Sequence, residues 1–263
     1  MTLDYSVRRR DEAARFAGAL RSVDPGARVP TCPDWAADDL LWHLAEVFSF
    51  WGTVVRERLD DPDGAELPDS ARPDDHAGLL ALFDTANQAL TAALDDTPDD
   101  VSVWTWSRDN SVGFVRRRMA HEALIHRLDA EVTAGSATGT DIDADFAADG
   151  VAEALEHFYG GYPPWAQWDP HGPVGRLQAD DTGDEWTFRL GGFSGVSPNT
   201  GKSYEDEPSL ELVGSGRPSF TLTGTARDLD AWIWNRPTLV EPTAAGDKAD
   251  FQQFGALIKN GVD

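Results

Sequence analysis

The chain has 263 residues, of which 41% are hydrophobic, and it carries a formal net charge of −24 with a pI near 4.4. This length fits one large domain or two ordinary ones, and the apolar content is sufficient for real cores. Because so acidic a surface repels phosphates, we expect neither nucleic acid nor an anionic membrane as a partner.

Cysteine usage and hydropathy indicate the compartment. The single cysteine, Cys32, cannot form an internal disulfide, which fits a reducing environment. The N-terminal residues lack the apolar core of a signal peptide, and no apolar run reaches the 18 residues expected of a membrane span. We therefore expect a soluble, cytoplasmic protein.

Apolar residues at helical spacing predict the first two helices. One is expected over about residues 4–23, ended by Pro25 and Gly26, with three successive arginines in solvent: Arg8, Arg9 and Arg10. The next is expected to begin after an N-cap at Asp34 and to run to about Leu59. Cys32 precedes it in a loop that we expect to be packed rather than catalytic, because no helix N-terminus plainly activates the thiol.

Two more helices complete the N-terminal half. After an Asp/Pro-rich loop at 60–75, a third helix is expected over about 75–94, with His76 exposed at its start. A solvated acidic linker follows at 95–100. The fourth helix, over 111–131, contains no proline and repeats bulky apolar residues at helical spacing. Four such helices predict a bundle.

One face of the fourth helix combines apolar and chemically active side chains. The residues that share it follow one another by three or four positions: Val115, Met119, Glu122, His126 and Asp129. The apolar members indicate that this face looks inward, which places Glu122 and His126 inside the protein. A buried carboxylate is costly unless a charge or hydrogen bonds compensate it, and a metal ion is the strongest compensator. At i and i+4, both side chains can reach one cation.

Two interpretations of this pair remain open. Either it binds a metal, or His126 is a hydrogen-bonded core histidine and Glu122 pairs with an arginine. The spacing excludes the zincin motif, since His121 and His126 are five residues apart and point to different faces. On the second helix, His43 lies along the apolar side. With Glu122 and His126 present, His43 is the natural third ligand at the core of the bundle.

The C-terminal half has a different periodicity. A fifth helix is expected over 141–159, and the sequence Gly160-Gly-Tyr-Pro-Pro164 then ends the helical pattern. Beyond it, a period near two predicts four strands, at 174–179, 185–190, 209–213 and 219–223. A long loop is expected at 191–208.

Two helices follow these strands, at 226–235 and at 248–259. A run of helices followed by a run of strands is typical of the α+β class. We therefore predict a four-helix bundle at 1–160 and a small α+β domain at 161–263, with an antiparallel or mixed sheet.

Several short motifs, taken together, resemble one family. Cys32-Pro-Asp-Trp35 precedes Asp39-Leu-Leu-Trp-His43-Leu44, and Trp104-x-Trp106 precedes Arg117-Arg-Met-Ala-His-Glu122-x-x-x-His126-Arg-Leu-Asp129. These motifs resemble the mycothiol-dependent maleylpyruvate isomerase family, whose N-terminal part is a DinB-like metal-binding four-helix bundle. The segment from Thr221 to Arg236 is similar to the strand-to-helix segment of that family's sterol-carrier-like C-terminal domain.

The resemblance implies a site and a chemistry. It implies that His43, Glu122 and His126 bind a divalent metal, with zinc expected, and leave one coordination position open. Three protein ligands with water in the fourth place are also typical of catalytic zinc. The cofactor that the family uses is mycothiol, whose thiolate adds to an activated cis double bond, so that rotation and expulsion give the trans product. In related chemistry, the thiolate opens an electrophile and stays attached to it.

Two further residues are candidates for catalytic roles. Asp129, one turn beyond His126, either orients a ligand histidine or forms a surface ion pair with an arginine. Arg236 follows the first helix of the C-terminal domain. It either binds a substrate carboxylate across the domain junction or is an ordinary surface arginine.

Three functions are compatible with these observations. The expected one is a metal- and mycothiol-dependent isomerase or S-transferase that acts on a small electrophile as a monomer or small homo-oligomer. The second is a non-catalytic protein that holds a small apolar ligand, with a structural or absent metal; a structural zinc would normally have four protein ligands, which favours an open site. The third is a metal-dependent hydrolase, in which metal-bound water is the nucleophile and no thiol is needed.

Overall fold

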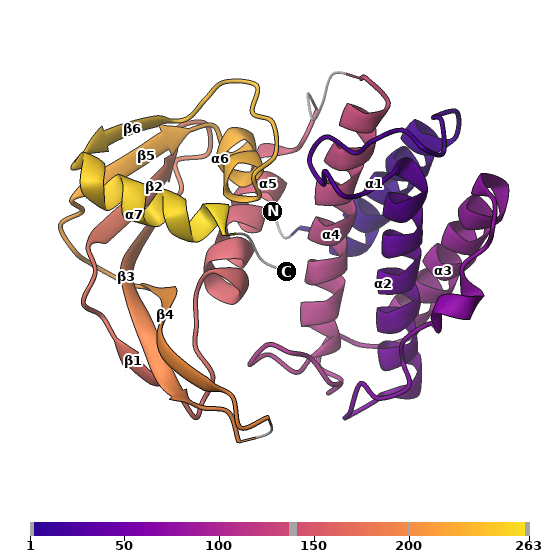
Figure 1. Ribbon diagram of the computed structural model, residues 1–263, viewed down its shortest axis with the longest axis horizontal. Helices are drawn as coiled ribbons and strands as arrows, with labels where there is room; N and C mark the ends of the chain where they lie inside the picture. Colours follow the sequence, from indigo (N-terminus) through magenta and orange to yellow (C-terminus); the bar gives the residue numbers. More distant parts are fainter. Residues whose placement is uncertain (1–2, 137–140, 199, 261–263) are drawn as a thin grey trace. The chain divides into compact units, whose positions relative to one another are not determined.

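A computed structural model describes residues 3–136, 141–198 and 200–260 of the chain (Figure 1). Its contacts divide the chain into two compact units, residues 1–138 and residues 139–263. Helices make up the first unit and a sheet with helices makes up the second, so the predicted α+β class is confirmed. No helix within the described ranges is long and apolar enough to cross a membrane.

The division between the units lies before the fifth helix, α5 (Ala144–Glu153), whereas the sequence predicts it at residue 160. The buried residues of α5 belong to the same core as the sheet and as α6 (Ala226–Ile233). The apolar face of α5 is therefore covered within the second unit. A one-turn π-helix, Ala154–Phe158, extends α5 before the chain enters the sheet.

Four long helices form the first unit (Figure 1): α1 (Tyr5–Leu20), α2 (Ala37–Glu57), α3 (His76–Asp95) and α4 (Val112–Thr133). A short 3-10 turn, Asp69–Ala71, lies between α2 and α3. The main contacts pair α1 with α4 and α2 with α3. The inward residues of all four helices share one hydrophobic core, in which the Phe83 ring packs against those of Phe16 and Phe48.

The beginnings of the helices follow ordinary capping chemistry, with one exception. The side chains of Asp4, Asp75 and Ser111 accept hydrogen bonds from the first turns of α1, α3 and α4. The prediction that Asp34 caps α2 is wrong, because the N-cap residue is Ala36. The Ala36 N–H donates to Asp39 Oδ2 at 2.8 Å, so a carboxylate three residues inside the helix holds the turn.

Arg9 lies inside the bundle, and the expectation that it is solvated is wrong. Its side chain is buried because the guanidinium donates to Asn87 Oδ1 and to Thr91 Oγ1 of α3, each at 2.5 Å. Burial lowers the pKa of Arg9 to about 10. Partners on a neighbouring helix thus made an inward position possible for a residue that the local sequence assigns to the surface.

His76 is not exposed either. Its Nδ1 lies 2.5 Å from Asp38 Oδ1, and its Nε2 lies 3.1 Å from the Leu20 carbonyl oxygen. The imidazole at the start of α3 therefore joins the end of α1 to the first turn of α2. A carboxylate and a helix-end carbonyl provided two partners that the sequence near His76 does not reveal.

The second unit is a six-stranded mixed sheet with helices (Figure 1). Its strands are β1 (Gln167–Asp169), β2 (Val174–Ala179), β3 (Glu185–Val196), β4 (Ser203–Leu212), β5 (Phe220–Gly224) and β6 (Thr243–Gly246). Hydrogen-bonded neighbours follow the order β1-β3-β2-β5-β6, and β4 also pairs with β3. The β2–β5 pair is parallel, and the other described pairs are antiparallel. The last helix, α7 (Lys248–Lys259), has the predicted bounds.

The predicted long loop at 191–208 is instead largely strand, because β3 continues to Val196 and β4 begins at Ser203. Glycines concealed the strand in the sequence, and atoms of neighbouring strands lie close to them. A Cβ on Gly191 would lie 2.3 Å from the Asp169 carbonyl oxygen, and one on Gly192 would lie 2.0 Å from Asp206 Oδ1. The backbone contact at Gly191 requires glycine, whereas at Gly192 the flexible side chain of Asp206 could move aside.

Side-chain alternation gives the sheet one buried face and one polar face. The buried face contains large apolar residues of four strands: Leu177, Phe188, Leu190, Leu210, Phe220 and Leu222. α6 and α7 contact β2 and β5. The ring of Phe254 on α7 lies 4.7 Å from that of Phe188 and 5.8 Å from that of Phe220, measured between centroids. These helices therefore close the core of the second unit.

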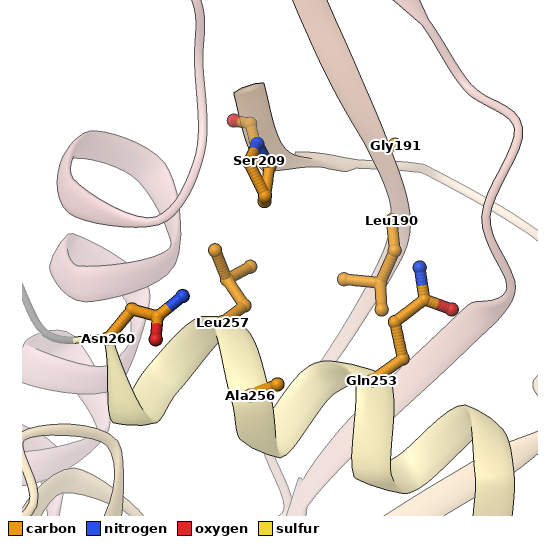
Figure 2. Close-up of a pocket in the computed structure, with 8 residues that line it drawn as sticks. Leu190, Gly191, Ser209, Gln253, Ala256, Leu257 and Asn260 are labelled. Carbon is orange, nitrogen blue, oxygen red and sulfur yellow. The ribbon is translucent and has the colours of Figure 1, made fainter. Parts of the chain in front are cut away.

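A small pocket lies where α7 meets β3 and β4 (Figure 2). It is lined by Leu190, Gly191, Pro208, Ser209, Gln253, Ala256, Leu257 and Asn260. Its volume is about 150 Å³. Ordinary ligand pockets have roughly 300–1,000 Å³. The pocket therefore offers little room for the apolar ligand of the carrier hypothesis.

A buried ion pair joins α1 to α4. Arg127 Nε lies 3.0 Å from Glu12 Oε2, and the two side chains are 0% and 8% exposed. Glu131 Oε1 lies 3.5 Å from the same nitrogen. Removing one member of such a pair leaves charge inside the protein with less compensation.

We predict that Arg127→Met lowers the free energy of unfolding by about 3 kcal/mol, because two carboxylates lose their shared cation. Urea denaturation followed by far-UV circular dichroism measures the change. The matched control is Arg10→Met, which removes a surface pair with Asp95 and should cost less than about 1 kcal/mol. Equal losses in the two variants would contradict the prediction.

Candidate metal centre

Four polar side chains follow one stripe of α4. Arg118, Glu122, His126 and Asp129 are separated by four, four and three residues, so they lie along one side of the helix. Their side chains are 4%, 18%, 10% and 0% exposed, respectively. In so enclosed a position each polar group needs a partner, and much of the pairing runs along the stripe itself.

Three donor atoms converge between α2 and α4. His43 Nε2 lies 3.1 Å from His126 Nε2 and 3.5 Å from Glu122 Oε1, and His126 Nε2 lies 3.2 Å from the same oxygen. The three atoms form a nearly equilateral triangle. Among the residues that the structure describes, these three make up the one group whose ligand atoms are close enough to share a metal ion.

Asp129 stands directly behind His126. Its Oδ2 lies 2.9 Å from His126 Nδ1, and its Oδ1 accepts a hydrogen bond from Thr31 Oγ1 at 2.6 Å. A proton on Nδ1 leaves Nε2 of the neutral imidazole with its lone pair directed into the triangle. Asp129 is fully buried, so it does not lie at the surface as the ion-pair alternative assumed.

The two oxygens of Glu122 have different partners. Oε1 faces the two imidazoles, whereas Oε2 accepts a hydrogen bond from Nη2 of Arg118 at 3.0 Å. The guanidinium and the carboxylate are four residues apart on α4, which is the spacing that favours such pairs. The charge of Glu122 is therefore shared between the triangle and Arg118.

The loop before α2 contacts both histidine positions. Backbone hydrogen bonds close it, among them one from the Trp35 N–H to the Cys32 carbonyl. The ring of Trp35 lies against His43, with centroids 4.7 Å apart, and Thr31 holds Asp129. Cys32 is half-buried, with Sγ 4.0 Å from Asp129 Oδ2, and it is not one of the three converging residues.

The protonation of the site follows from these contacts. Burial by itself would raise the pKa of Glu122, but hydrogen bonds with the two histidines and the charges of His126 and Arg118 hold it well below its usual range. Burial by itself would lower the pKa of His126, yet hydrogen bonds with Asp129 and Glu122 raise it to about 9. In metal-free protein near neutral pH, the His126 ring is therefore protonated on both nitrogens and positively charged, and Glu122 is negatively charged.

The triangle fits a divalent cation. Zinc–ligand bonds of about 2.0–2.2 Å at tetrahedral angles place neighbouring donors roughly 3.3 Å apart. The observed separations of 3.1, 3.2 and 3.5 Å lie on both sides of that value. One proton can bridge only two of the three atoms, whereas a cation at the centre would contact all of them. Two imidazole nitrogens and one carboxylate oxygen are also a donor set that zinc accepts in catalytic sites.

Of the two other predicted site residues, Asp129 lies beside the triangle and Arg236 does not belong to the first unit. Arg236 follows α6 in the second unit, where its Nη1 donates to the Trp234 carbonyl oxygen at 2.6 Å. Its role toward a substrate stays a prediction.

Sequence reasoning missed Arg118 and Thr31. Arg118 stands four residues before Glu122, so helical spacing alone could have added it to the stripe. Thr31 is separated from Asp129 by 98 positions. No local pattern links these two residues, and only the folded bundle brings them together.

We predict that His126 titrates with a pKa of about 9 in chelator-treated protein, as measured by NMR of the imidazole. Because this value lies above the ordinary 6.5, the proton stabilises the fold fully below about pH 6.5, and this contribution is lost as the pH rises through about 9. Asp129→Asn should lower the pKa of His126, because it removes the negative charge next to Nδ1. His171, which is paired with Asp206 in the second unit, is the internal control. An unchanged His126 titration in the variant would contradict the prediction.

Comparisons with known proteins follow both units. Residues 8–131 match the sequence model of the mycothiol maleylpyruvate isomerase N-terminal domain, and residues 145–253 match that of the C-terminal domain of the same family (MDMPI). The fold is similar to the crystal structures of a mycothiol-dependent maleylpyruvate isomerase and of a histidine-to-alanine mutant, with TM-scores of 0.59 and 0.61, sequence identities of 15% and 14%, and 94% of each chain covered.

No curated protein matches the sequence. The two domain matches nevertheless extend over most of the chain and include the whole of the stripe on α4. The chain is therefore an enzyme that belongs to the mycothiol-dependent maleylpyruvate isomerase family.

Proposed function

We propose that His43, Glu122 and His126 hold one divalent cation, with zinc expected, and that mycothiol binds at the position left open. The observation that supports this most is the convergence of three donor atoms within 3.5 Å of one another. When bound, the metal would lower the pKa of a coordinating thiol, so that the thiolate exists near neutral pH.

The residues around the triangle orient its donor atoms for metal binding. Asp129, held by Thr31, keeps the Nε2 lone pair of His126 directed inward. Trp35 restricts the orientation of the His43 ring. The His43 side chain is 32% exposed, so an external ligand can approach the donors from its side.

The reaction that we propose is addition of the thiolate to a small electrophile. Addition to an activated cis double bond forms a C–S bond and moves the electron pair onto the activating group. After rotation about the resulting single bond, that pair re-forms the double bond and expels the thiolate, which gives the trans product. The two similar structures are named as a mycothiol-dependent maleylpyruvate isomerase, which is compatible with this reaction. An electrophile that cannot expel the thiolate would leave as an S-conjugate, which is the transferase version of the same step.

Two observations make the alternatives weaker. A structural metal would need a fourth protein donor. Cys32, the nearest sulfur in the sequence motif, is not part of the group of converging ligands. The pocket between α7, β3 and β4, at about 150 Å³, is too small for a sizeable apolar ligand of the carrier hypothesis. The hydrolase hypothesis uses the same site, but it requires no thiol, whereas the reaction that we propose does.

We predict about one divalent metal per purified chain, and its loss in His43→Ala and in His126→Ala, because two donors bind a cation far more weakly than three. Mass spectrometry of the metal content measures this. The control is His171→Ala, an exposed histidine of the second unit, which should retain the metal. Full metal content in both ligand variants would exclude this site.

The same protein separates the hypotheses when cobalt replaces the native metal. We expect mycothiol to change the visible absorption of the cobalt enzyme, and turnover of maleylpyruvate to require the thiol. Ester hydrolysis without any thiol would favour the hydrolase. A well-folded protein that takes up no metal but binds an apolar ligand would favour the carrier.

We also propose that Arg236 binds a carboxylate of the substrate. Arg236→Met should raise the KM for a carboxylate substrate by about tenfold or more, the effect of losing a charged hydrogen bond, and leave the metal content unchanged. Arg217→Met, at an exposed arginine of the second unit, is the control. Equal KM values for the two variants would show that Arg236 has only a surface role.

A further inference from the structure

We propose that Arg118 is a positioning residue that keeps one coordination position of the metal free for the thiol, because it holds the second carboxylate oxygen of Glu122. The proposal rests on the metal site proposed above. It concerns the way in which Glu122 binds, which the identity of the three ligands leaves undecided.

The contacts of Glu122 are divided between two directions. Oε1 lies 3.2 Å from His126 Nε2 and 3.5 Å from His43 Nε2, whereas Oε2 lies 3.0 Å from Nη2 of Arg118. The Arg118 side chain is 4% exposed, so water competes little for this hydrogen bond. A charge-assisted bond in such an enclosed place is strong and directional.

A carboxylate can bind a cation through one oxygen or through both. If Oε2 were free, rotation of the carboxylate could bring it to the metal as a fourth protein donor, which would fill the position that a thiol needs. With Oε2 bound to Arg118, only Oε1 is available to the metal. The hydrogen bond from Arg118 thus determines whether the metal has three protein donor atoms or four.

Retention of the metal does not explain Arg118. A guanidinium next to the site repels a divalent cation, so by charge alone it weakens metal binding. The same charge favours an incoming thiolate. The position of Arg118 beside the outer oxygen of Glu122 is therefore expected of a residue that keeps the fourth coordination position free. Arg118 is not needed to retain the cation.

The test compares zinc- and cobalt-loaded wild type, Arg118→Met and Arg118→Lys. In the wild type, zinc X-ray absorption should show a carboxylate bound through one oxygen. In Arg118→Met the metal should stay bound while Glu122 changes from one bound oxygen to two, and the mycothiol affinity of the cobalt enzyme should fall about tenfold, the usual size of an outer-shell effect. Arg118→Lys retains a cation and should recover most of the thiol affinity. Thermal unfolding of the loaded proteins gives a separate readout of stability.

Arg9→Met is the matched control. Arg9 is also a buried arginine of the bundle, but its partners, Asn87 and Thr91, lie on α3. We expect this variant to lose stability without any change in coordination or in thiol affinity. If Arg118→Met behaves in the same way, Arg118 has only a structural role and the proposal is overturned.

Two further outcomes remain decisive. A bidentate Glu122 in the wild-type absorption spectrum would overturn the proposal even if Arg118→Met failed to fold. Failure of the wild type to bind zinc or cobalt would instead overturn the metal site itself, and the two failures are therefore distinguishable.

Discussion

The site depends on one electrostatic constraint: a carboxylate oxygen and two imidazole nitrogens meet within 3.5 Å inside a helical bundle. Three electron-rich atoms this close repel one another unless positive charge lies between them. A proton on His126 meets part of this requirement, and a divalent cation meets all of it. Two groups lie behind the triangle: Asp129 Oδ2 is 2.9 Å from His126 Nδ1, and Arg118 donates a hydrogen bond to the outer oxygen of Glu122.

The bundle maintains this constraint by enclosing α4. One side of the helix faces α1, where Arg127 meets Glu12, and another carries the stripe that faces His43 on α2. Polar residues inside a core cost stability unless every one has a partner. Here the polar residues bind one another by hydrogen bonds and ion pairs. The loop before α2 adds Thr31, which donates to Asp129, and Trp35, which packs against His43. The helices thus supply rigid positions for a site that would be poorly defined on loops alone.

The second unit is built by different physics. Strand alternation gives its sheet one apolar face, which α6 and α7 cover, and the aromatic cluster around Phe254 fills the space between them. The similar solved structures share this fold at only 14–15% identity. Such divergence means that fold alone does not assign residue roles. Those assignments come from the distances and burial within the chain itself.

Much of this protein could be predicted from its sequence. Helical and strand periodicity predicted the four helices, the change to a sheet and the inward face of α4, because these patterns depend on local spacing. The convergence of His43 with Glu122 and His126 was expected from the inward positions of all three. Errors arose at Arg9, His76 and the glycine-rich strand β3, where partners far along the chain outweigh local preference. Thr31 and the division of the Glu122 oxygens belong to the tertiary structure alone, because hydrogen-bond partners are chosen by positions in space and not by spacing along the chain.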